Sequence, residues 1–394
     1  MTRPNPSPTT VTSSTTSSLP TTTSSTPSSD PEERLAYLAL ALIEGLGPRR
    51  IAQMLSRAGS ARATFANLDN ALTGMRALPA PLAAALRRPP LQAARDLLEQ
   101  SAARGHHILT PADADFPALL RSIPDPPPLL FGIGNVALAN AEAVAIVGSR
   151  DHTRYGGDVA ERLGIVAAEA GLVVVSGMAR GLDAMAQRAA HNAGGTSIGV
   201  LGTGIDLVYP VENGELFELV ARDGLLLSEL PPGMPGHKGS FPARNRLISG
   251  LARALVVVEA AESSGTLITV GTALEQGRDV LVVPGPISSG TSSGTNRLLR
   301  DGAVPILTPS DILIPYGIVP ASGRPAPRPV VAPCTLSPTE ARVFGALTGE
   351  GQSVDDLAEL IGLPVGELLA SLLGLELGGL AQQLPGALYR TRNA

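Results

Sequence analysis

Seven short apolar runs that are rich in Val, Ile and Leu recur between residues 140 and 315, and they constrain the fold more than any other feature of the sequence. Each run is continuously apolar rather than alternating, which is typical of strands that are covered on both faces. The runs lie at Ala143–Val147, Leu172–Val175, Ser197–Leu201, Leu225–Leu227, Ala254–Val258, Val280–Val283 and Val304–Leu307. Stretches of helical length separate most of them, such as Asp158–Ala170 and Ala184–Ala193. Strands that alternate with helices in this way predict a doubly wound α/β fold with a parallel sheet.

A helical region precedes the predicted sheet. Its apolar side chains recur at helical spacing, at Leu35, Leu38, Leu42 and Ile43. The helix then breaks around Gly45 and Gly47, and a second helix begins after Pro48. Two helices around a Gly-x-Gly turn are typical of a helix-hairpin-helix, whose backbone N–H groups approach a phosphate. The same residues fit a tight helix end followed by a helix that starts with proline, and we prefer that simpler interpretation.

The C-terminal region predicts a winged helix. Three short helices are expected at Pro338–Leu347, Ser353–Ile361 and Val365–Leu377, followed by a β-hairpin that turns at Pro385-Gly386. A winged helix that reads duplex DNA would carry Lys or Arg on its third helix. Here that helix carries Glu367 and Glu376 and no basic residue. A packing or protein-contact role is therefore favoured over duplex recognition.

Two further segments have compositions that disfavour a packed core. Residues 1–31 are nearly all Ser, Thr and Pro, and such a segment buries too little apolar surface to offset its ordering entropy, which predicts a disordered tail. Residues 316–333 are rich in proline and predict a stiff linker. Between and after these segments we expect a helical domain at 32–130, a sheet domain at 131–315 and a winged-helix domain at 334–394.

Composition excludes several classes of protein. Cys334 is the only cysteine in 394 residues, so neither a disulfide framework nor a cysteine metal cluster is expected, and a reducing cytoplasm fits. The five histidines form no metal-binding pattern, and we expect no metal. No apolar run approaches the ~18 residues of a membrane span and no signal sequence is evident, so we expect a cytoplasmic protein without membrane contact. The net charge of −5 disfavours a global nucleic-acid footprint, and any nucleic acid must bind a local patch.

The loops expected at the carboxyl ends of the strands are rich in Gly, Ser and Thr. They include Gly148-Ser149-Arg150, Ser176–Gly181, Gly202-Thr203-Gly204, Glu259–Thr266 and Pro284–Gly290. Backbone N–H groups and hydroxyls in such loops are open to an anion, and Arg150 and Arg180 add positive charge, so a phosphate-bearing ligand is predicted. Neither the third glycine of a dinucleotide-binding GxGxxG pattern nor a P-loop is present, and we expect no cofactor.

The segment Gly236–Arg246 is the densest functional candidate. This Gly/Pro-rich segment, which we expect to be a loop, holds Lys238, the only lysine of the chain, together with Phe241, Arg244 and Arg246. Cations that surround an aromatic ring are what single-stranded nucleic acid requires, because phosphates pair with the charges and a base stacks on the ring. The alternative is that Phe241 caps the core while the arginines pair with carboxylates such as Glu229 or Glu259.

The catalytic patterns that we sought are missing. Ser149, Ser176 and Ser264 have no evident His/Asp partner, and no GxSxG motif is present. Acidic residues near the predicted strand ends, such as Asp183 and Asp206, fit helix capping and arginine pairing. We therefore expect a protein that is not an enzyme.

Six segments, in order, resemble motifs of the DprA/Smf family, the bacterial DNA-processing protein A. They are Ala145–Arg150, Val175–Asp183, Gly199–Asp206, Phe241–Gly250, Val258–Thr269 and Val283–Gly285. The resemblance implies an extended Rossmann-like sheet domain, with a helical N-terminal domain (helix-hairpin-helix or SAM-like) and a C-terminal winged helix. It implies a non-catalytic recombination mediator that binds single-stranded DNA in a positive pocket, forms a homodimer and loads the RecA recombinase during natural transformation.

Carried over to this sequence, the resemblance implies that Arg150, Lys238 and Phe241 contact DNA and that Arg244 and the glycine-rich turns line the same pocket. The full set of predicted nucleic-acid-binding residues is Gly148, Ser149, Arg150, Gly177, Arg180, Gly181, Gly202, Thr203, Gly204, Lys238, Phe241, Pro242, Arg244, Asn245, Arg246, Ser264, Gly265 and Thr266.

Two other functions compete with this one. A nucleotide-processing enzyme of the phosphoribohydrolase type could use Gly265-Thr266 and Glu275, although Ser263-Ser264 stands where such enzymes usually have a glycine pair. A duplex-specific transcription factor would act through the C-terminal region, and the acidic third helix disfavours it.

Overall fold

The computed structural model describes residues 30–75, 78–318, 336–349, 351–378, 380–384 and 388–391. The chain divides into two compact units, Met1–Pro320 and Ala321–Ala394. The predicted tail and the predicted linker lie outside the described residues, apart from residues 30–31 and 316–318 at their ends. The predicted turn at Pro385-Gly386 also lies outside them.

The first unit is built on one large sheet with the strand order β1-β2-β6-β5-β4-β3-β7-β8-β9. Its strands are β1 (His107–Leu109), β2 (Leu130–Gly134), β3 (Ala143–Val147), β4 (Val173–Ser176), β5 (Ser197–Val200), β6 (Leu225–Ser228), β7 (Ala254–Val257), β8 (Asp279–Val282) and β9 (Val304–Pro305). Every predicted run carries a strand, and β3 to β9 pair in parallel. The doubly wound, Rossmann-like fold is confirmed.

Two short strands extend this sheet in a way that the sequence did not predict. β2 pairs with β6 and β1 pairs with β2, both in antiparallel orientation. The sheet therefore begins at His107, inside the range predicted to be helical. A strand as short as β1 has no periodicity of its own, and only its pairing with β2 defines it.

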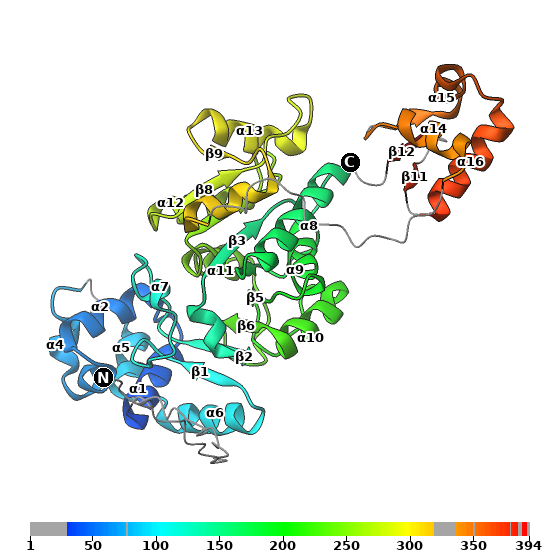
Figure 1. The fold of residues 1–394 in the computed structure, drawn as a ribbon. Coiled ribbons are helices and arrows are strands. Elements are labelled where there is room, and N and C mark those ends of the chain that lie inside the picture. Colours follow the sequence, from blue (N-terminus) through cyan, green and yellow to red (C-terminus); the bar gives the residue numbers. More distant parts are fainter. Residues whose placement is uncertain are drawn as a thin grey trace, which may run out of the picture. The chain divides into compact units, whose positions relative to one another are not determined.

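Both faces of the parallel strands are buried, which explains why their apolar runs do not alternate. Along β3, Val144 and Ile146 face one hydrophobic core while Ala145 and Val147 face the other. α8, α9 and η4 pack on the first core, and α7, α11 and α12 pack on the second (Figure 1). The helices of this part are α7 (Ala118–Arg121), α8 (Arg154–Glu169), α9 (Leu182–Asn192), α10 (Gly214–Asp223), α11 (Ser240–Gly250), α12 (Thr266–Glu275) and α13 (Ser293–Arg300), with the 3₁₀ helices η1 (Val136–Asn140), η2 (Val211–Asn213), η3 (Gly290–Ser292) and η4 (Pro309–Tyr316).

The N-terminal helices pack against the β1-β2-β6 end of the sheet. They are α1 (Pro31–Ala41), α2 (Pro48–Ala58), α3 (Ala61–Ala66), α4 (Leu68–Leu72), α5 (Ala80–Arg87) and α6 (Leu91–Ala103). Leu35 and Leu38 of α1 share a hydrophobic cluster with Phe131 and Leu226 of the sheet. Between α1 and α2, Gly45 has a φ of +79°, and Pro48 starts α2 directly after Gly47. Both interpretations of this turn fit this geometry, and the preference between them stays a prediction.

The second unit has the winged-helix arrangement that the sequence predicts. Its helices are α14 (Pro338–Ala346), α15 (Val354–Ile361) and α16 (Val365–Leu377), and its strands are β10 (Gln352–Ser353), β11 (Ala381–Leu384) and β12 (Leu388–Thr391). The strands form a small sheet in the order β10-β12-β11. Leu357, Leu368, Leu372 and Tyr389 are buried in the core of this unit.

No single helix within the described residues is both long and apolar enough to cross a membrane. The bent pair of α15 and α16 passes the same test of length and composition when its two helices are taken together. That pair buries Leu357, Leu368 and Leu372 inside the winged-helix unit, as expected for core helices of a folded domain.

Candidate nucleic-acid interface

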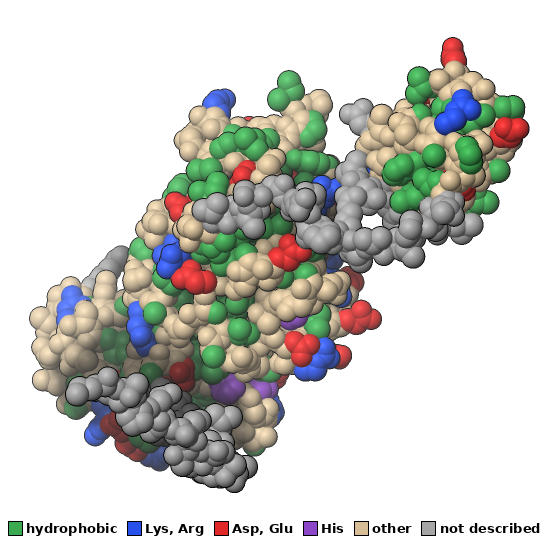
Figure 2. Space-filling view, viewed as in Figure 1, with side chains coloured by type: hydrophobic (Ala, Val, Ile, Leu, Met, Phe, Trp, Pro, Cys, Tyr) green, Lys and Arg blue, Asp and Glu red, His purple; other side chains and the backbone are tan. Residues whose placement is uncertain are grey.

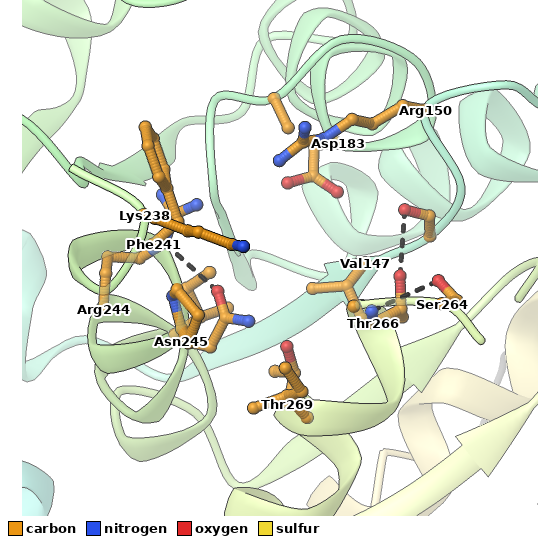
Figure 3. Close-up of a pocket in the computed structure, with 16 residues that line it drawn as sticks. Val147, Arg150, Asp183, Lys238, Phe241, Arg244, Asn245, Ser264, Thr266 and Thr269 are labelled. Carbon is orange, nitrogen blue, oxygen red and sulfur yellow. Dashed lines mark hydrogen bonds between the residues drawn. The ribbon is translucent and has the colours of Figure 1, made fainter. Parts of the chain in front are cut away.

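A pocket of about 490 Å³ opens at the carboxyl ends of the parallel strands. After β3 the chain continues to β4, β5 and β6 on one side of β3, and β7 to β9 lie on the other side. Ligands of doubly wound sheets bind at such a switch point, because the loops of the two flanking strands part there. The pocket is lined by Val147, Gly148, Arg150, Ala179, Asp183, Lys238, Phe241, Pro242, Arg244, Asn245, Ile248, Ser264, Gly265, Thr266, Ile268 and Thr269 (Figure 3). We call it the switch-point pocket.

A second pocket, of about 340 Å³, adjoins the first. It is lined by Arg150, Gly177, Ala179, Arg180, Gly202, Tyr209, Pro210, Val211, Glu212, Phe241 and Arg244, and we call it the Tyr209 pocket. Arg150, Ala179, Phe241 and Arg244 line both pockets. The two pockets therefore form one groove across the carboxyl edge of the sheet.

Three exposed cations border the groove. Arg150 lines both pockets, Lys238 lines the switch-point pocket and Arg180 lines the Tyr209 pocket. Within the described part of the chain, none of the three forms an ion pair. Their charges are therefore free to neutralise a phosphate. The N-terminus of α12, at Thr266, adds the partial positive charge of a helix end to the same pocket.

The segment predicted as a loop at Gly236–Arg246 is helical from Ser240 onward, which corrects that expectation. Pro242 lies in the first turn of α11, where a proline does not break a helix. Side chains three or four residues apart share a face of a helix, and so Phe241, Asn245 and Ile248 all line the switch-point pocket. The helix also turns Arg244 and Arg246 inward, where both are buried.

Arg244 supports the floor of the groove. Its Nη1 donates to the carbonyl oxygen of Gly177 (2.7 Å) and to that of Val200, and its Nε donates to Oδ1 of Asn245 (3.3 Å). Burial lowers the pKa of Arg244 to about 10, and the nearby Asp183 carboxylate opposes that shift. Arg244 is therefore charged at neutral pH, but it is largely committed to interactions inside the protein.

Arg246 pairs with a carboxylate, which is the alternative role that the sequence analysis left open for the arginines of this segment. Its Nη2 donates to Oε1 of Glu229 (2.6 Å), and its Nε lies 3.4 Å from Oδ2 of Asp125. It lines neither pocket of the groove. Burial raises the pKa of Glu229, and the charge of Arg246 opposes that shift. The structure thus assigns Arg246 to a buried ion pair rather than to the groove surface.

Phe241 stands between the two pockets. A Cβ atom on Gly202 would lie 2.6 Å from Cδ1 of Phe241, and one on Gly236 would lie 2.9 Å from its Cζ, so these glycines make room for the ring. The ring of Tyr209 lies beside it, with centroids 5.2 Å apart and planes tilted by 42°. Phe241 is half-buried, and it is therefore both a part of the packing and a wall of the groove.

Several predicted residues hold the turns around the groove without lining it. Ser149 Oγ donates to the carbonyl oxygen of Asp151 (2.7 Å), and Thr203 Oγ1 donates to that of Leu207 (3.1 Å). Gly181 has a φ of +80°, and a Cβ atom there would lie 2.6 Å from the carbonyl oxygen of Ser149. A Cβ atom on Gly204 would lie 2.5 Å from the carbonyl oxygen of Pro231. These residues shape the loops through backbone packing.

The other predicted residues gather in the groove. Gly148, Arg150, Lys238, Phe241, Pro242, Arg244, Asn245, Ser264, Gly265 and Thr266 line the switch-point pocket, and Gly177, Arg180 and Gly202 line the Tyr209 pocket. Thr266 Oγ1 donates to the carbonyl oxygen of Gly148 (3.2 Å), which ties the start of α12 to the turn after β3. That these residues contact DNA stays a prediction.

Sequence reasoning missed several side chains of the groove, among them Asp183 and Tyr209. Asp183 was assigned to capping or pairing, and it does accept a hydrogen bond from the Gly177 N–H (3.1 Å), but it also lines the switch-point pocket. Tyr209 was not singled out. The signal that could have found it is an aromatic ring next to a proline, shortly after the Gly202-Thr203-Gly204 turn, in a chain with 3% aromatic residues.

Glu275, the acid of the competing phosphoribohydrolase interpretation, lies at the far end of α12 from Thr266 and lines neither pocket. Among the residues that the structure describes, no group of three or more His, Cys, Asp or Glu side chains could hold a metal ion.

Comparisons with known proteins agree with this fold. A family model for DNA recombination-mediator protein A matches residues 107–317, and a model for the DprA winged helix domain matches residues 325–387. Protein Smf of Synechocystis sp. is 35% identical over 328 residues, which are 75% of this chain and 82% of that protein. DNA processing protein DprA of Streptococcus pneumoniae is 43% identical over 204 residues, which are 52% of this chain and 72% of that protein.

The crystal structure of DNA processing protein A from Streptococcus pneumoniae aligns with a TM-score of 0.63 and 34% identity, and the alignment covers 73% of this chain and 98% of that one. The family model alone spans more than half of the chain, and its range holds the sheet and both pockets of the groove. The chain therefore belongs to the DNA recombination-mediator protein A (DprA/Smf) family.

Proposed function

We propose that this protein binds single-stranded DNA in the groove formed by the switch-point pocket and the Tyr209 pocket. The observation that carries the proposal is the set of exposed, unpaired cations around a half-buried aromatic ring: Arg150, Arg180 and Lys238 around Phe241. Phosphates of a DNA strand pair with such cations, and an unstacked base packs on such a ring. Membership in a family of DNA recombination mediators supports this ligand over a free nucleotide.

Preference for single strands follows from the shape of the site. The aromatic ring lies inside the groove and not on an open helix surface, so a base must leave its stack to reach it. Bases of a duplex have both faces covered by their neighbours, and unstacking them costs free energy. Stacking on an aromatic side chain contributes about 1–3 kcal/mol per base, and this contribution is available to a single strand without prior unstacking.

We further propose that the protein protects incoming DNA in the cytoplasm and loads the RecA recombinase onto it during natural transformation, as a homodimer. The family description supports the mediator role. Two grooves on one dimer would hold a long strand at two points, and the second point would bind at high effective concentration. No catalytic step is part of this function, and the groove serves to bind and to release the strand.

The experiment that tests the proposal is fluorescence anisotropy with a labelled single strand and with a duplex of the same sequence, over a series of salt concentrations. Arg150→Ala and Lys238→Glu should each weaken single-strand binding about tenfold, as expected for one charge-assisted contact. The slope of log K against log salt should become shallower by about 0.7 for each phosphate that the variant no longer neutralises.

Arg222→Ala is the matched control. Arg222 ends α10 just before β6 begins, so it lies at the amino edge of the sheet, opposite the groove. It is exposed and pairs with Asp223 (2.7 Å). Its substitution removes one positive charge but should leave DNA binding unchanged. If the two groove variants bind like the wild type, or if all three variants lose affinity equally, the assignment of DNA to the groove is wrong.

A further inference from the structure

The Tyr209 pocket has an aromatic ring of its own that the packing of the protein does not require. Tyr209 is 51% exposed, and the neighbouring Val211 is 79% exposed. Within the described residues the Tyr209 hydroxyl makes no hydrogen bond. An apolar ring left in water forgoes roughly 25 cal/mol for each Å² that it could bury. The ring therefore contributes little to the fold beyond its tilted contact with Phe241.

The loop that carries Tyr209 is nevertheless held in place. The N–H of Gly204 donates to the carbonyl oxygen of Met234 (2.7 Å) at the start of the loop. Just beyond Tyr209, Nδ2 of the buried Asn213 donates to the carbonyl oxygens of Met178 (3.0 Å) and Ala179 (3.1 Å). The loop is thus anchored to the turn that follows β4, and the exposed ring is positioned before any ligand arrives. A positioned ring loses little conformational freedom on binding.

The charges of this pocket are arranged for a nucleotide. Arg150 and Arg180 supply positive charge to the pocket, and the exposed Glu212 adds a carboxylate beside Tyr209 and Val211. A phosphate is attracted to the arginines and repelled by Glu212. A nucleobase suits the part of the pocket around Tyr209 and Glu212, because its face stacks on an aromatic ring and its amino group donates to a carboxylate.

We propose that the Tyr209 pocket is a second base subsite, which takes a neighbouring nucleotide of the strand held in the switch-point pocket. This inference rests on the proposed binding of single-stranded DNA. Phe241 and Arg150 belong to both pockets, so the aromatic pair of Phe241 and Tyr209 separates two bases while Arg150 serves the phosphate backbone between them. Tyr209 is then a binding residue for DNA, and Glu212 orients the base.

The natural sequence offers a clean reporter for this subsite, because it contains no tryptophan. A Tyr209→Trp variant therefore carries a single indole at the proposed contact. We expect its fluorescence to change when a single strand binds, since a stacked base quenches the indole, and to change little with a strand that has abasic positions throughout. The same titration gives the dissociation constant by a readout independent of the label used in anisotropy.

Affinity measurements complete the test. Tyr209→Ala should weaken single-strand binding about 5- to 150-fold, the range that corresponds to the loss of one stacked base. Tyr209→Phe should bind like the wild type, because the ring is retained. Val208→Ala, a change at a 38% exposed neighbour that lines neither pocket, is the control. The difference between the wild type and Tyr209→Ala should shrink on strands with abasic positions.

The outcomes separate this inference from the proposed function. Suppose that the wild type binds single strands and that Arg150→Ala weakens this binding. If Tyr209→Ala then has no effect and the indole of Tyr209→Trp does not respond, the second base subsite is wrong, while the assignment of DNA to the groove stands. If the wild type does not bind single strands at low salt, both proposals fall. A melting curve for each variant establishes that a missing response does not come from an unfolded protein.

Discussion

Asp183 introduces a carboxylate into a pocket whose exposed charges, Arg150 and Lys238, are positive. Burial raises its pKa above the usual value for an aspartate, while the charge of Arg244 and the hydrogen bond from Gly177 oppose that shift. Ionisation of Asp183 therefore lowers the stability of the folded protein. The stability that this group contributes is fully present below the ordinary pKa of an aspartate, and it is lost as the pH rises through the higher pKa of the folded state.

The same carboxylate should oppose DNA binding, which gives a prediction with a defined sign. Asp183→Asn keeps the size of the side chain and one of its two acceptor oxygens, and it removes a negative charge from the pocket, where the carboxylate accepts from the N–H groups of Gly177 and Gly148. We expect it to bind single strands more tightly, by about 1 kcal/mol or fivefold, as one screened charge interaction at these distances allows. Wild-type affinity should rise as the pH falls toward the pKa of Asp183, and the variant should lose that part of the pH dependence.

Anisotropy titrations from neutral into acidic pH measure both effects. The informative quantity is the difference between the wild type and the Asp183→Asn protein, because effects of pH that are common to both proteins cancel. A variant that binds more weakly than the wild type, while melting at the same temperature, would show that the carboxylate contacts the strand instead of opposing it.

The elements of the fold differ in how well the sequence could predict them. Runs such as Ala143–Val147 identify strands without any knowledge of their neighbours, because burial on both faces leaves a continuous apolar pattern. β1 and β10 have no such pattern and exist only through their pairing with β2 and β12. Gly236–Arg246 was expected to be a loop because of Gly236, Gly239 and Pro242, yet α11 begins at Ser240 and the proline lies in its first turn.

The same limit applies to the groove, where the sequence could identify residues but not the directions in which their side chains point. Residue type singled out Arg150 at a strand end and Lys238 and Phe241 in one dense segment, and the resemblance to the DprA/Smf motifs placed the three at one site, where the structure brings them together. Whether an arginine faces the groove or the interior depends on the phase of α11, which the sequence did not reveal. Arg246 accordingly pairs with Glu229 inside the protein. Tyr209 reaches the groove only because its loop folds back onto Phe241.

The β9 edge of the sheet carries a prediction about assembly. β9 pairs with β8 on one side, and the strand order ends there. Apolar side chains near this edge are exposed, among them Val304 (47%), Leu307 (77%) and Ile314 (62%). Figure 2 shows hydrophobic side chains gathered at the end of the unit where β8, β9 and α13 lie in Figure 1. An open strand edge with apolar neighbours favours association with a second copy.

We expect Leu307→Glu to convert the proposed homodimer into a monomer, measured by light scattering after size-exclusion chromatography. Binding to a long single strand should weaken, because a monomer holds the strand at one point only, while binding to an oligonucleotide that fills one groove should not change. Leu91→Glu places the same charge on a 36% exposed leucine of α6, away from this edge, and should leave the mass unchanged. If the Leu307→Glu protein elutes as a dimer, the dimer interface does not lie at the β9 edge.

At the scale of the whole molecule, charge is divided unevenly between the two units. The cations that border the groove belong to the first unit, while α16 of the winged-helix unit carries Glu367 and Glu376 and no basic residue. In the described part of that unit, Arg342 donates to the carbonyl oxygen of Ile361 (2.9 Å) and Arg390 donates to Oε1 of Gln382 (3.2 Å). Both of these arginines are thus engaged within the unit, and its third helix, α16, offers no basic side chain to a phosphate backbone.

The exposed face of α16 leads to the last prediction. Val365, Leu369 and Leu373 lie four residues apart along this helix and are all exposed, so the helix that reads the major groove in duplex-binding relatives of this fold presents apolar side chains here. We expect duplex DNA to bind at least tenfold more weakly than a single strand of the same sequence. The double variant Leu369→Glu/Leu373→Glu should bind single strands within twofold of the wild type, measured by competition anisotropy. Loss of single-strand affinity in that variant, at an unchanged melting temperature, would place part of the DNA site on the winged helix. An unchanged affinity is the result expected if the groove of the sheet unit binds the strand, because the apolar face of α16 then takes no part in holding it.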